Sequence, residues 1–557
     1  MRKPYQIILP ILLVCFVPAV ARAQSFRVQC PTSTITHPVA ANNNSEPAYT
    51  GPTYSGTSGY PTAPANVNGA IKCQQISGGD GFATMADGSQ TFMFSFGPLS
   101  GLADIAKGLP GTQVPAAFNT VYPGSLHPGD PDTTGLASFI GSDGAPYNGA
   151  IGLAYDVYAD ANGNPLPGVI DGHVDPRQIM DVGVMNGNIP APLMAFDEDD
   201  EFFLTLSNVG MIMRPDLFEQ HTVHFHGYPN ASAVYDGVPD ASVAINIGGS
   251  FTYYYLAPDA GTYFWHCHIT PPEHLQMGMV GQLYVRPRQD RVPAGTSLYT
   301  SLLLQQNDLR TACRRPGDGG PTNPTNVTTA PDILCSNPLP ANLGILPGNT
   351  TATAATAGVL YAYNDGDGVS AYDVEYPLQI HGFDPNFHFV GMTFNPENFA
   401  TMKDKYFLLN GRSYPDTVTA GPLEAESADG TKHFSQPLPS IITMKAGQRA
   451  LLRISDLDVS EYQTLASLGI PMHVVGYNAK LLRDQAGNNL DYYTNSITLA
   501  GGESLDVILD SCAVHGAAGA CTTPIPAGTY YLYTPQLDHL SNDAENFGGL
   551  MTEVHIN

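Results

Sequence analysis

Two distant stretches of the chain repeat one pattern. The segment PDAGTYFWHCHI at 258–269 returns as IPAGTYYLYTPQ at 525–536. Upstream of each copy, by several tens of residues, stands a His/Gly segment, HTVHFHGY at 221–228 and IPMHVVGY at 470–477. A pattern that returns in the same order indicates two copies of one structural unit. The duplication therefore predicts a chain built from two versions of the same domain.

The composition of the remaining segments favours an all-β class. Short runs rich in Val, Ile, Phe and Tyr alternate with turn clusters, in keeping with 57 Gly and 47 Pro. The clearest expected strands are 201–210, 251–259, 281–287 and 504–510, whereas 396–409 predicts at most one short helix. We therefore expect each repeated unit to be a β-sandwich.

Changes in composition suggest the domain boundaries. Residues 1–23 combine a basic start, a short apolar run and an Ala-Arg-Ala ending, which is typical of a secretory signal peptide. Residues 24–290 would form the first domain, with a Gly/Asp/Pro-rich insertion at 98–176. A polar linker at 291–358 would lead to a second domain at 359–557 without a recognisable counterpart of the His-Cys-His segment of the first. No apolar run is long enough to span a membrane, so we predict an exported protein, periplasmic or extracellular.

Charge and cysteine usage narrow the partners and the compartment. The formal net charge of −27 argues against nucleic acid as a partner, because an acidic surface repels phosphates. An oxidising compartment favours disulfide bonds, although spacing alone leaves the connectivity open. Spacing suggests that one cysteine stays unpaired, Cys267 in the WHCHI segment, while the pairs are Cys30–Cys73, Cys313–Cys335 and Cys512–Cys521. A free thiol in an exported protein points to a function such as metal coordination.

Strand alternation sorts the histidines around Cys267 into two groups. Successive side chains on a strand point to opposite faces, so Cys267 would face away from His266 and His268. The same argument separates His221 from His224 and His226. Two such strands side by side would create two metal sites one residue apart. One site gathers Cys267 and His221 with His274 and Met279 from the following loop; the other gathers His224, His226, His266 and His268.

The two groups differ in chemistry. Two imidazoles, a thiolate and a thioether are the ligand set of a blue, or type 1, copper electron-transfer site. An all-imidazole group also suits copper. Zinc is a rival because it binds Cys and His, but histidines that face away from a lone thiolate fit its compact tetrahedron poorly. Buried histidines hydrogen-bonded in a core are the structural alternative.

At these residues the sequence resembles the multicopper oxidase family, which has the cupredoxin fold and is related to the two-domain copper nitrite reductases. HTVHFHG resembles the family's HPxHxHG segment, and WHCHITPPEHLQMGM resembles its HCHxxxH…GM segment with a slightly longer loop. The resemblance implies two cupredoxin-like Greek-key β-sandwiches. It also implies type 1 copper at His221, Cys267, His274 and Met279, and half of a type 2/type 3 copper cluster at His224, His226, His266 and His268.

The second half departs from the family pattern. The family's cluster uses four pairs of histidines, and this chain supplies two. In the repeat alignment His473 stands opposite His224, whereas Ile470 and Val475 stand opposite His221 and His226. We consider His473 and His539 as additional ligands, with ordinary structural histidines as the alternative for both.

These observations predict a copper-dependent oxidoreductase, with Cys267, His266 and His268 on the path between its two metal sites. The electron donor would be a phenol, a metal ion such as Cu(I), Mn(II) or Fe(II), or a redox protein, and O2 would be the acceptor. One alternative is a copper electron-transfer or copper-binding protein with a vestigial second site. Another is a nitrite-reductase-like homo-oligomer, a trimer, in which a neighbouring subunit completes the cluster.

Overall fold

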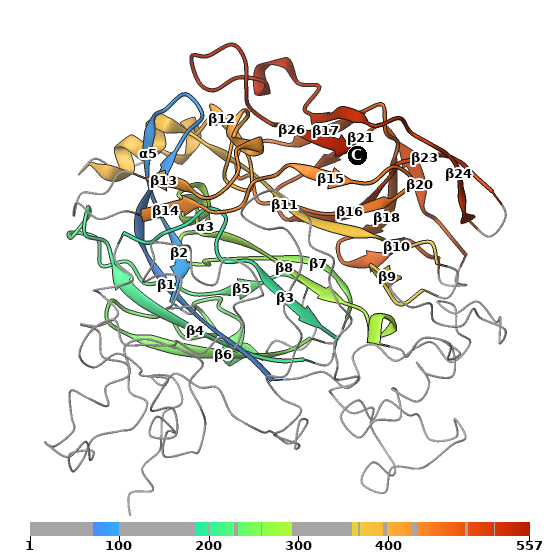
Figure 1. The fold of residues 1–557 in the computed structure, drawn as a ribbon. Coiled ribbons are helices and arrows are strands. Elements are labelled where there is room, and N and C mark those ends of the chain that lie inside the picture. Colours follow the sequence, from blue (N-terminus) through green and yellow to red (C-terminus); the bar gives the residue numbers. More distant parts are fainter. Residues whose placement is uncertain are drawn as a thin grey trace, which may run out of the picture.

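The computed structural model describes residues 71–99, 185–198, 200–227, 232–257, 259–291, 359–365, 368–393, 398–425, 433–484, 488–516 and 519–557. Within these ranges the chain forms mainly strands, with a few short helices. They assemble into two β-sandwiches packed against each other (Figure 1). The expected all-β fold of two cupredoxin-like sandwiches is confirmed.

The first sandwich consists of two four-stranded sheets. One sheet has the order β2-β1-β4-β6, formed by Gln90–Pro98, Ile71–Thr84, Glu201–Gly210 and Ser250–Leu256. The other has the order β3-β8-β7-β5, formed by Met194–Asp197, Val280–Arg286, Gly261–His266 and His224–Phe225. Aromatic side chains from both sheets fill the space between them, among them Phe94, Phe196, Tyr253 and Trp265. Large aromatic side chains dominate the energetics of such a core.

The second sandwich repeats this plan with more strands. Its larger sheet follows the order β12-β11-β16-β22-β18-β19, formed by Tyr406–Leu409, Val374–Phe383, Arg449–Asp456, Glu503–Asp510, Met472–Tyr477 and Lys480–Leu481, with β20 (Tyr492–Thr494) on β18. The facing sheet follows β15-β26-β25-β17-β21, formed by Ile442–Met444, Met551–Ile556, Gly528–Tyr533, Gln463–Leu468 and Ser496–Leu499. Aliphatic side chains fill its core. Smaller hairpins pair β9 with β10 (Leu360–Tyr361, Ala371–Tyr372), β13 with β14 (Leu423–Ala425, His433–Gln436) and β23 with β24 (Cys512–His515, Cys521–Pro524).

Strand pairing shows that the two sandwiches share one topology. β1 runs parallel to β4, which pairs antiparallel with β6, and β11, β16 and β22 repeat this arrangement. In the facing sheets, β3-β8-β7-β5 corresponds to β15-β26-β25-β17. The repeated Gly-Thr-Tyr segments form β7 and β25, which occupy equivalent places. The fold thus has the duplication that the sequence predicted.

One part of the predicted alignment is wrong. His224 pairs with His266 on β7, and the residue that replaces His266 in the repeat, Tyr533, pairs with Ala466 on β17. Ala466, rather than His473, is therefore the counterpart of His224 in the second sandwich. Gln463 is the counterpart of His221, because it lies three residues before Ala466 as His221 lies three residues before His224.

His473 lies on β18, which belongs to the other sheet and pairs with β22 and β20. Its ring stacks on Tyr493 with ring centroids 4.3 Å apart, and its Nε2 contacts the carboxylate of Asp491. These contacts with Tyr493 and Asp491 give His473 a structural role. It also lies far along the sequence from the predicted copper ligands. Similarity of MHVVGY to VHFHGY misled the alignment because both segments have a histidine three residues before a Gly-Tyr pair.

Strand β7 lies where the two sandwiches meet. Tyr263 and Trp265 point into the core of the first sandwich, while Phe264 packs with Phe383 and Leu457 of the second. Oγ1 of Thr262 donates to Asp506 at 2.5 Å, so hydrogen bonds as well as apolar contacts join β7 to β22. The alternation of β7 therefore sends one face of the strand into its own core and the other toward the neighbouring sandwich.

Several sequence expectations fall on other parts of the chain. The predicted signal peptide, nearly all of the insertion and linker, and Cys30, Cys313 and Cys335 lie outside the described residues. The predicted Cys512–Cys521 disulfide is present, and Cys267 is a free, buried cysteine. In the described ranges no helix has both the length and the apolar character needed to cross a bilayer.

Candidate metal centre

Cys267 follows directly after the last residue of β7 and points into the core of the first sandwich. The next segment turns back through α3 (Pro271–Gln276), a six-residue helix that begins with two prolines, before β8 starts at Val280. Prolines suit the first turn of a helix because its N–H groups have no intrahelical partner. This tight reversal places the loop between β7 and β8 directly over Cys267.

His221, Cys267 and His274 meet in this core. Their ligand atoms all lie within 4.8 Å of one another, and all three side chains are fully buried. His274 Nδ1 lies 3.2 Å from Cys267 Sγ, and the backbone N–H of Thr222 donates to the same sulfur at 3.4 Å. Neither ring nitrogen of His221 has a hydrogen-bond partner. An imidazole buried without partners is costly unless something binds it, so this donor set fits a metal ion.

The charges around Cys267 favour its thiolate form. Burial by itself would raise the pKa of the Cys267 thiol, but the neighbouring imidazoles of His274 and His221 together outweigh it and hold that pKa well below its usual value. Burial would lower the pKa of His274, yet the Cys267 thiolate raises it to about 9. A thiolate is the form in which cysteine binds metals.

Met279, the fourth predicted ligand, is fully buried in the same core as Cys267. Its backbone carbonyl accepts a hydrogen bond from the Cys267 N–H at 3.2 Å, and its own N–H donates to the His274 carbonyl at 2.9 Å. These bonds fix the three residues of the loop relative to one another. The gathered His221, Cys267 and His274, with Met279 buried in the same core, therefore match the ligand chemistry of a type 1 site.

Three of the four remaining histidines form a second group on the opposite face of β7. Ligand atoms of His224, His226 and His266 lie within 4.8 Å of one another. Nε2 of His226 is 2.8 Å from Nε2 of His266, and Nδ1 of His224 is 2.5 Å from the carbonyl oxygen of Asp236. The last contact fixes the His224 tautomer, because an Nδ1–H that donates leaves Nε2 free to bind a metal.

Burial keeps this second group uncharged. It lowers the pKa of His226 to about 4 and that of His266 to about 3, and it lowers the pKa of His224 as well. Neutral imidazoles keep the lone pairs that a metal needs. The three residues therefore fit a site for one metal ion with three nitrogen ligands.

His268 stands slightly apart from this group. Its ring centroid is 5.0 Å from that of His224 and 5.6 Å from that of His266, and the side chain is partly exposed. It does not belong to the set of ligand atoms within 4.8 Å. The structure thus brings together three of the four predicted cluster histidines, with the fourth at the rim.

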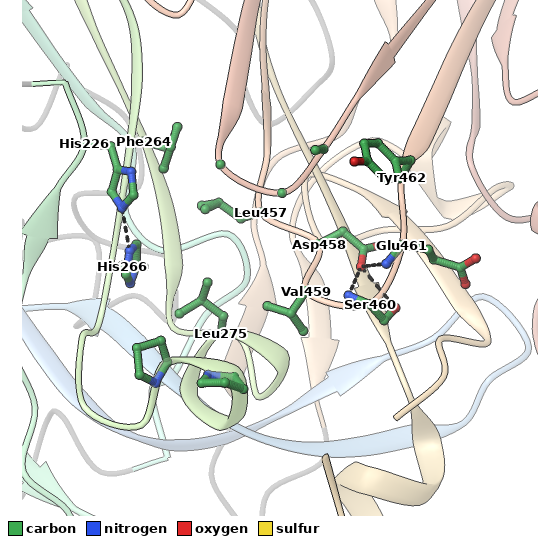
Figure 2. A pocket seen from close by; sticks show the side chains of 15 residues that line it. His226, Phe264, His266, Leu275, Leu457, Asp458, Val459, Ser460, Glu461 and Tyr462 are labelled. Atoms are coloured by element: carbon green, nitrogen blue, oxygen red, sulfur yellow. Dashed lines mark hydrogen bonds between the residues drawn. The ribbon is translucent and has the colours of Figure 1, made fainter. Parts of the chain in front are cut away.

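A cavity of about 530 Å³ opens beside His226 and His266, between the two sandwiches. Figure 2 shows the two histidines on one wall and the segment 457–462 of the second sandwich on the other. Apolar side chains, Phe264, Leu275 and Leu457, lie closest to the histidines, whereas Asp458 and Ser460 lie farther away. A small molecule could therefore reach the imidazoles from this side.

The second sandwich retains the backbone of the first site without its key ligands. Thr534 follows β25 as Cys267 follows β7, and its N–H donates to Leu550 O at 2.9 Å. The N–H of Leu550 donates in turn to His539 O at 3.0 Å. These bonds reproduce those among Cys267, Met279 and His274. The four ligand positions of the first sandwich thus correspond, in order, to Gln463, Thr534, His539 and Leu550 in the second.

At that place the second sandwich has a hydrogen bond instead of a ligand set. Nδ1 of His539 lies 3.0 Å from Oε1 of Gln463, and the buried His539 ring stacks on Phe407 with centroids 3.9 Å apart. Among the described residues, no group of metal-binding side chains forms around His539. The prediction that His539 could serve the copper cluster therefore receives no support from its position.

Sequence reasoning missed Glu219, which lies beside the first site. Its carboxylate is 3.6 Å from His274 Nε2, and this close imidazole holds the pKa of Glu219 below its usual value despite partial burial. Glu461 stands in the same relation to His539, at 3.4 Å. The signal was available: Glu-x-His-Thr at 219–222 returns as Glu-x-Gln-Thr at 461–464.

Part of this chain is similar in sequence to known multicopper oxidases and laccases. Residues 170–290 match the family model described as multicopper oxidase. Laccase 1 of Metarhizium guizhouense is 29% identical over 127 residues, 22% of this chain and 19% of that protein. Laccase-1 of Emericella nidulans is 36% identical over 107 residues, 19% of this chain and 16% of that protein. The crystal structure of a blue copper oxidase from Nitrosomonas europaea has 20% identity and a TM-score of 0.39, covering 67% of this chain and 79% of that one.

A thiolate–imidazole set beside an imidazole set on a β-sandwich defines the class of cupredoxin-fold copper proteins. Residues 170–290, which contain the eight ligands predicted for the two sites, are similar to the multicopper oxidase family. The chain spans only about a fifth of the length of the curated laccases it matches.

Proposed function

We propose that this protein is an exported copper-dependent oxidoreductase that oxidises a donor at the first site and reduces a small acceptor at the second. The observation that carries the proposal is the position of Cys267 and His266. They are neighbours in sequence, yet their side chains belong to two separate ligand groups on opposite faces of β7. When bound, copper would supply one-electron redox chemistry at both sites.

The chain's own residues would give each site its properties. His221, Cys267, His274 and Met279 would hold type 1 copper in a core that excludes water. The N–H of Thr222 directed at Cys267 Sγ would tune the site, since hydrogen bonds to a ligating sulfur alter a metal's potential. The peptide link from Cys267 to His266 would be the short covalent path between the two sites.

Donor oxidation would take place near His274. Both imidazoles of the first site are fully buried, and Glu219 covers the Nε2 edge of His274 while remaining partly exposed. A phenol, a reduced metal ion or a redox protein would approach at this carboxylate. Among these donors a cationic one would gain most from the negative charge of Glu219.

Acceptor reduction would take place at His224, His226 and His266. The cavity beside them is lined by apolar side chains on the near side, which suits a small neutral molecule such as O2. His268 at the rim could extend the site. A type 2/type 3 copper cluster of the usual multicopper size would need further imidazoles, supplied either by a neighbouring subunit or by unpaired histidines of this chain.

The three-imidazole geometry also favours a second candidate function. Three nitrogen ligands within 4.8 Å of one another suit a single copper ion, as in the nitrite-reductase-like alternative. In that case the acceptor would be nitrite. A copper carrier whose second site is vestigial is the non-enzymatic alternative.

Copper stoichiometry measured together with acceptor consumption tests the proposal. The oxidase predicts an intense blue absorption band, at least two coppers per chain and O2 uptake that depends on the donor. Nitric oxide from nitrite with two coppers would favour the second candidate. One copper per chain with no consumption of either acceptor would leave only the carrier, and a protein that binds no copper would refute all three.

A further inference from the structure

A buried side chain, Gln276, connects the loop of the first proposed site to the second sandwich. This residue ends α3, two positions after His274 and three before Met279. Its side chain is fully buried, and both polar groups of the amide bond to the second sandwich. Nε2 donates to Asp404 Oδ1 at 2.9 Å, and Oε1 accepts from the Asp384 N–H at 2.8 Å.

A second contact with the second sandwich involves the backbone of Gln276. Nε2 of His388, on α5 (Pro385–Met392), lies 3.0 Å from the carbonyl oxygen of Gln276. The other ring nitrogen of His388 lies 2.5 Å from the carbonyl oxygen of Phe92 on β2. The imidazole thus stands between two elements of the first sandwich. β2 also carries Phe94, whose ring packs edge-on against His274 with centroids 5.0 Å apart.

The loop after Gln276 is packed against the second sandwich as well. Gly278 has φ +110°, and a Cβ there would come within 3.6 Å of the Phe383 ring. Its carbonyl also accepts a hydrogen bond from Ser95 of β2. The segment that supplies His274 and Met279 is therefore enclosed between β2 on one side and the second sandwich on the other.

We propose that Gln276 is a positioning residue through which the second sandwich holds the loop of the first copper site in its ligating geometry. The inference rests on the proposed type 1 site, and it assigns a role to a sandwich that carries no ligand for it. Hydrogen bonds around ligands fix their orientation, and losing such a bond commonly lowers metal affinity 10–100-fold. Gln276 reaches no ligand atom itself, so its effect passes through the backbone of α3.

The chain offers a matched control. Gln282 on β8 is also buried, and its Nε2 also crosses to the second sandwich, reaching the Arg453 carbonyl at 2.7 Å and Ser455 Oγ at 3.1 Å. It lies on the regular strand after the loop. Gln276→Met and Gln282→Met therefore remove chemically equivalent contacts between the sandwiches, one at the loop and one beyond it.

The test compares these variants in the full-length protein. We expect Gln276→Met to release copper from the blue site at least about tenfold faster, to shift the blue band and its EPR hyperfine splitting, and to speed amide hydrogen exchange over 271–279 in copper-free protein. Gln282→Met should lose comparable thermal stability but keep the wild-type spectrum, release rate and loop exchange. Equal behaviour of the two variants would overturn the proposal.

A second pair of variants leaves the loop sequence untouched, in case Gln276→Met does not fold. Asp404→Ala removes the acceptor for Gln276 Nε2, whereas Asp404→Asn keeps an oxygen there. Burial and the neighbouring Asp458 carboxylate raise the pKa of Asp404 well above its usual value, so the neutral amide is a close substitute. Asp404→Ala should reproduce the Gln276→Met changes and Asp404→Asn should resemble wild type; any other ranking contradicts the role. If the wild-type protein binds no blue copper, the proposed function fails. The hydrogen-exchange measurements then still decide whether Gln276 positions the loop.

Discussion

The two sandwiches share strand order, strand pairing and the backbone bonds of the loop, yet they differ completely in metal chemistry. Cys267 and Thr534 make the same backbone hydrogen bond, and Glu219 and Glu461 stand beside the equivalent imidazoles. The difference lies in a few side chains on a common framework. The comparison teaches that the backbone of this loop does not depend on the cysteine, because the second sandwich keeps the same backbone bonds with a threonine in its place.

Replacing the thiolate should have the largest effect. Cys267→Ser should abolish the blue band and remove the first copper, because an alcohol is not deprotonated as a thiol is and binds copper weakly. Thr534→Ser, at the equivalent place in the second sandwich, should leave both unchanged. Visible absorption and copper analysis check this pair. A blue band that survives Cys267→Ser would contradict the view that the cysteine distinguishes the first sandwich from the second.

Removing one imidazole on the other face of β7 should affect the second site of the first sandwich and leave the first site intact. His226→Ala leaves two of the three gathered imidazoles, so we expect loss of the second copper and of acceptor reduction, with the blue band retained. His268→Ala should have a smaller effect, because its ring stands outside the group of three. Copper counting, EPR and O2 uptake distinguish these outcomes. Loss of the blue band in His226→Ala would show that the sites are not independent.

Restoring ligands to the second sandwich would test the comparison from the other side. The triple substitution Gln463→His, Thr534→Cys and Leu550→Met would place the ligand set of the first site on the shared backbone around His539. We expect about one additional copper per chain and a stronger blue band, since the ligand types would then match. The same triple variant carrying Cys267→Ser would report the new site alone. A colourless product would mean that side-chain packing, rather than ligand identity, separates the two sandwiches.

The hydrogen bond that stands in place of a metal should contribute measurably to stability. Gln463→Leu leaves the buried His539 Nδ1 and Asp458 Oδ2 without their Gln463 partner, and an unsatisfied buried polar group costs about 1–3 kcal/mol. Denaturant unfolding measures this loss. His221→Ala in copper-free protein should show no comparable hydrogen-bond penalty, because the His221 nitrogens have no partner to lose. Equal penalties would argue against the assignment of His221 to a metal.

The two carboxylates should give the smallest and most specific difference. Glu219→Gln removes the charge next to His274, so copper affinity at the blue site should fall by about tenfold at most and oxidation of cationic donors should slow. Glu461→Gln should change neither quantity. Copper titration and steady-state kinetics with a cationic and a neutral donor provide the measurement. A Glu461 effect as large as that of Glu219 would indicate that donors approach at the second sandwich instead.

The sequence predicted the features that depend on local pattern. Alternation along 261–268 separated Cys267 from His266, and the repeat of Gly-Thr-Tyr indicated the duplicated sandwich. Features that depend on which sheet a strand joins were not predictable, because buried strands look alike. His473 was therefore assigned to the wrong strand, and Ala466, a residue with no distinguishing feature in the sequence, holds the place equivalent to that of His224. Gln276 was not predictable because its role depends on contacts formed only in the folded chain, whereas Glu219 had a signal in the repeated Glu-x-His-Thr and Glu-x-Gln-Thr segments.

The complete enclosure of His221, Cys267 and His274 has a consequence for how the ion arrives. A solvated ion cannot reach three side chains that expose no surface, so uptake requires a transient opening of the loop that covers them. At high concentrations of added ion, the uptake rate should level off at the rate of that opening. The same enclosure would slow dissociation of the ion, so the protein would retain it in the presence of a chelator for as long as the loop stays closed.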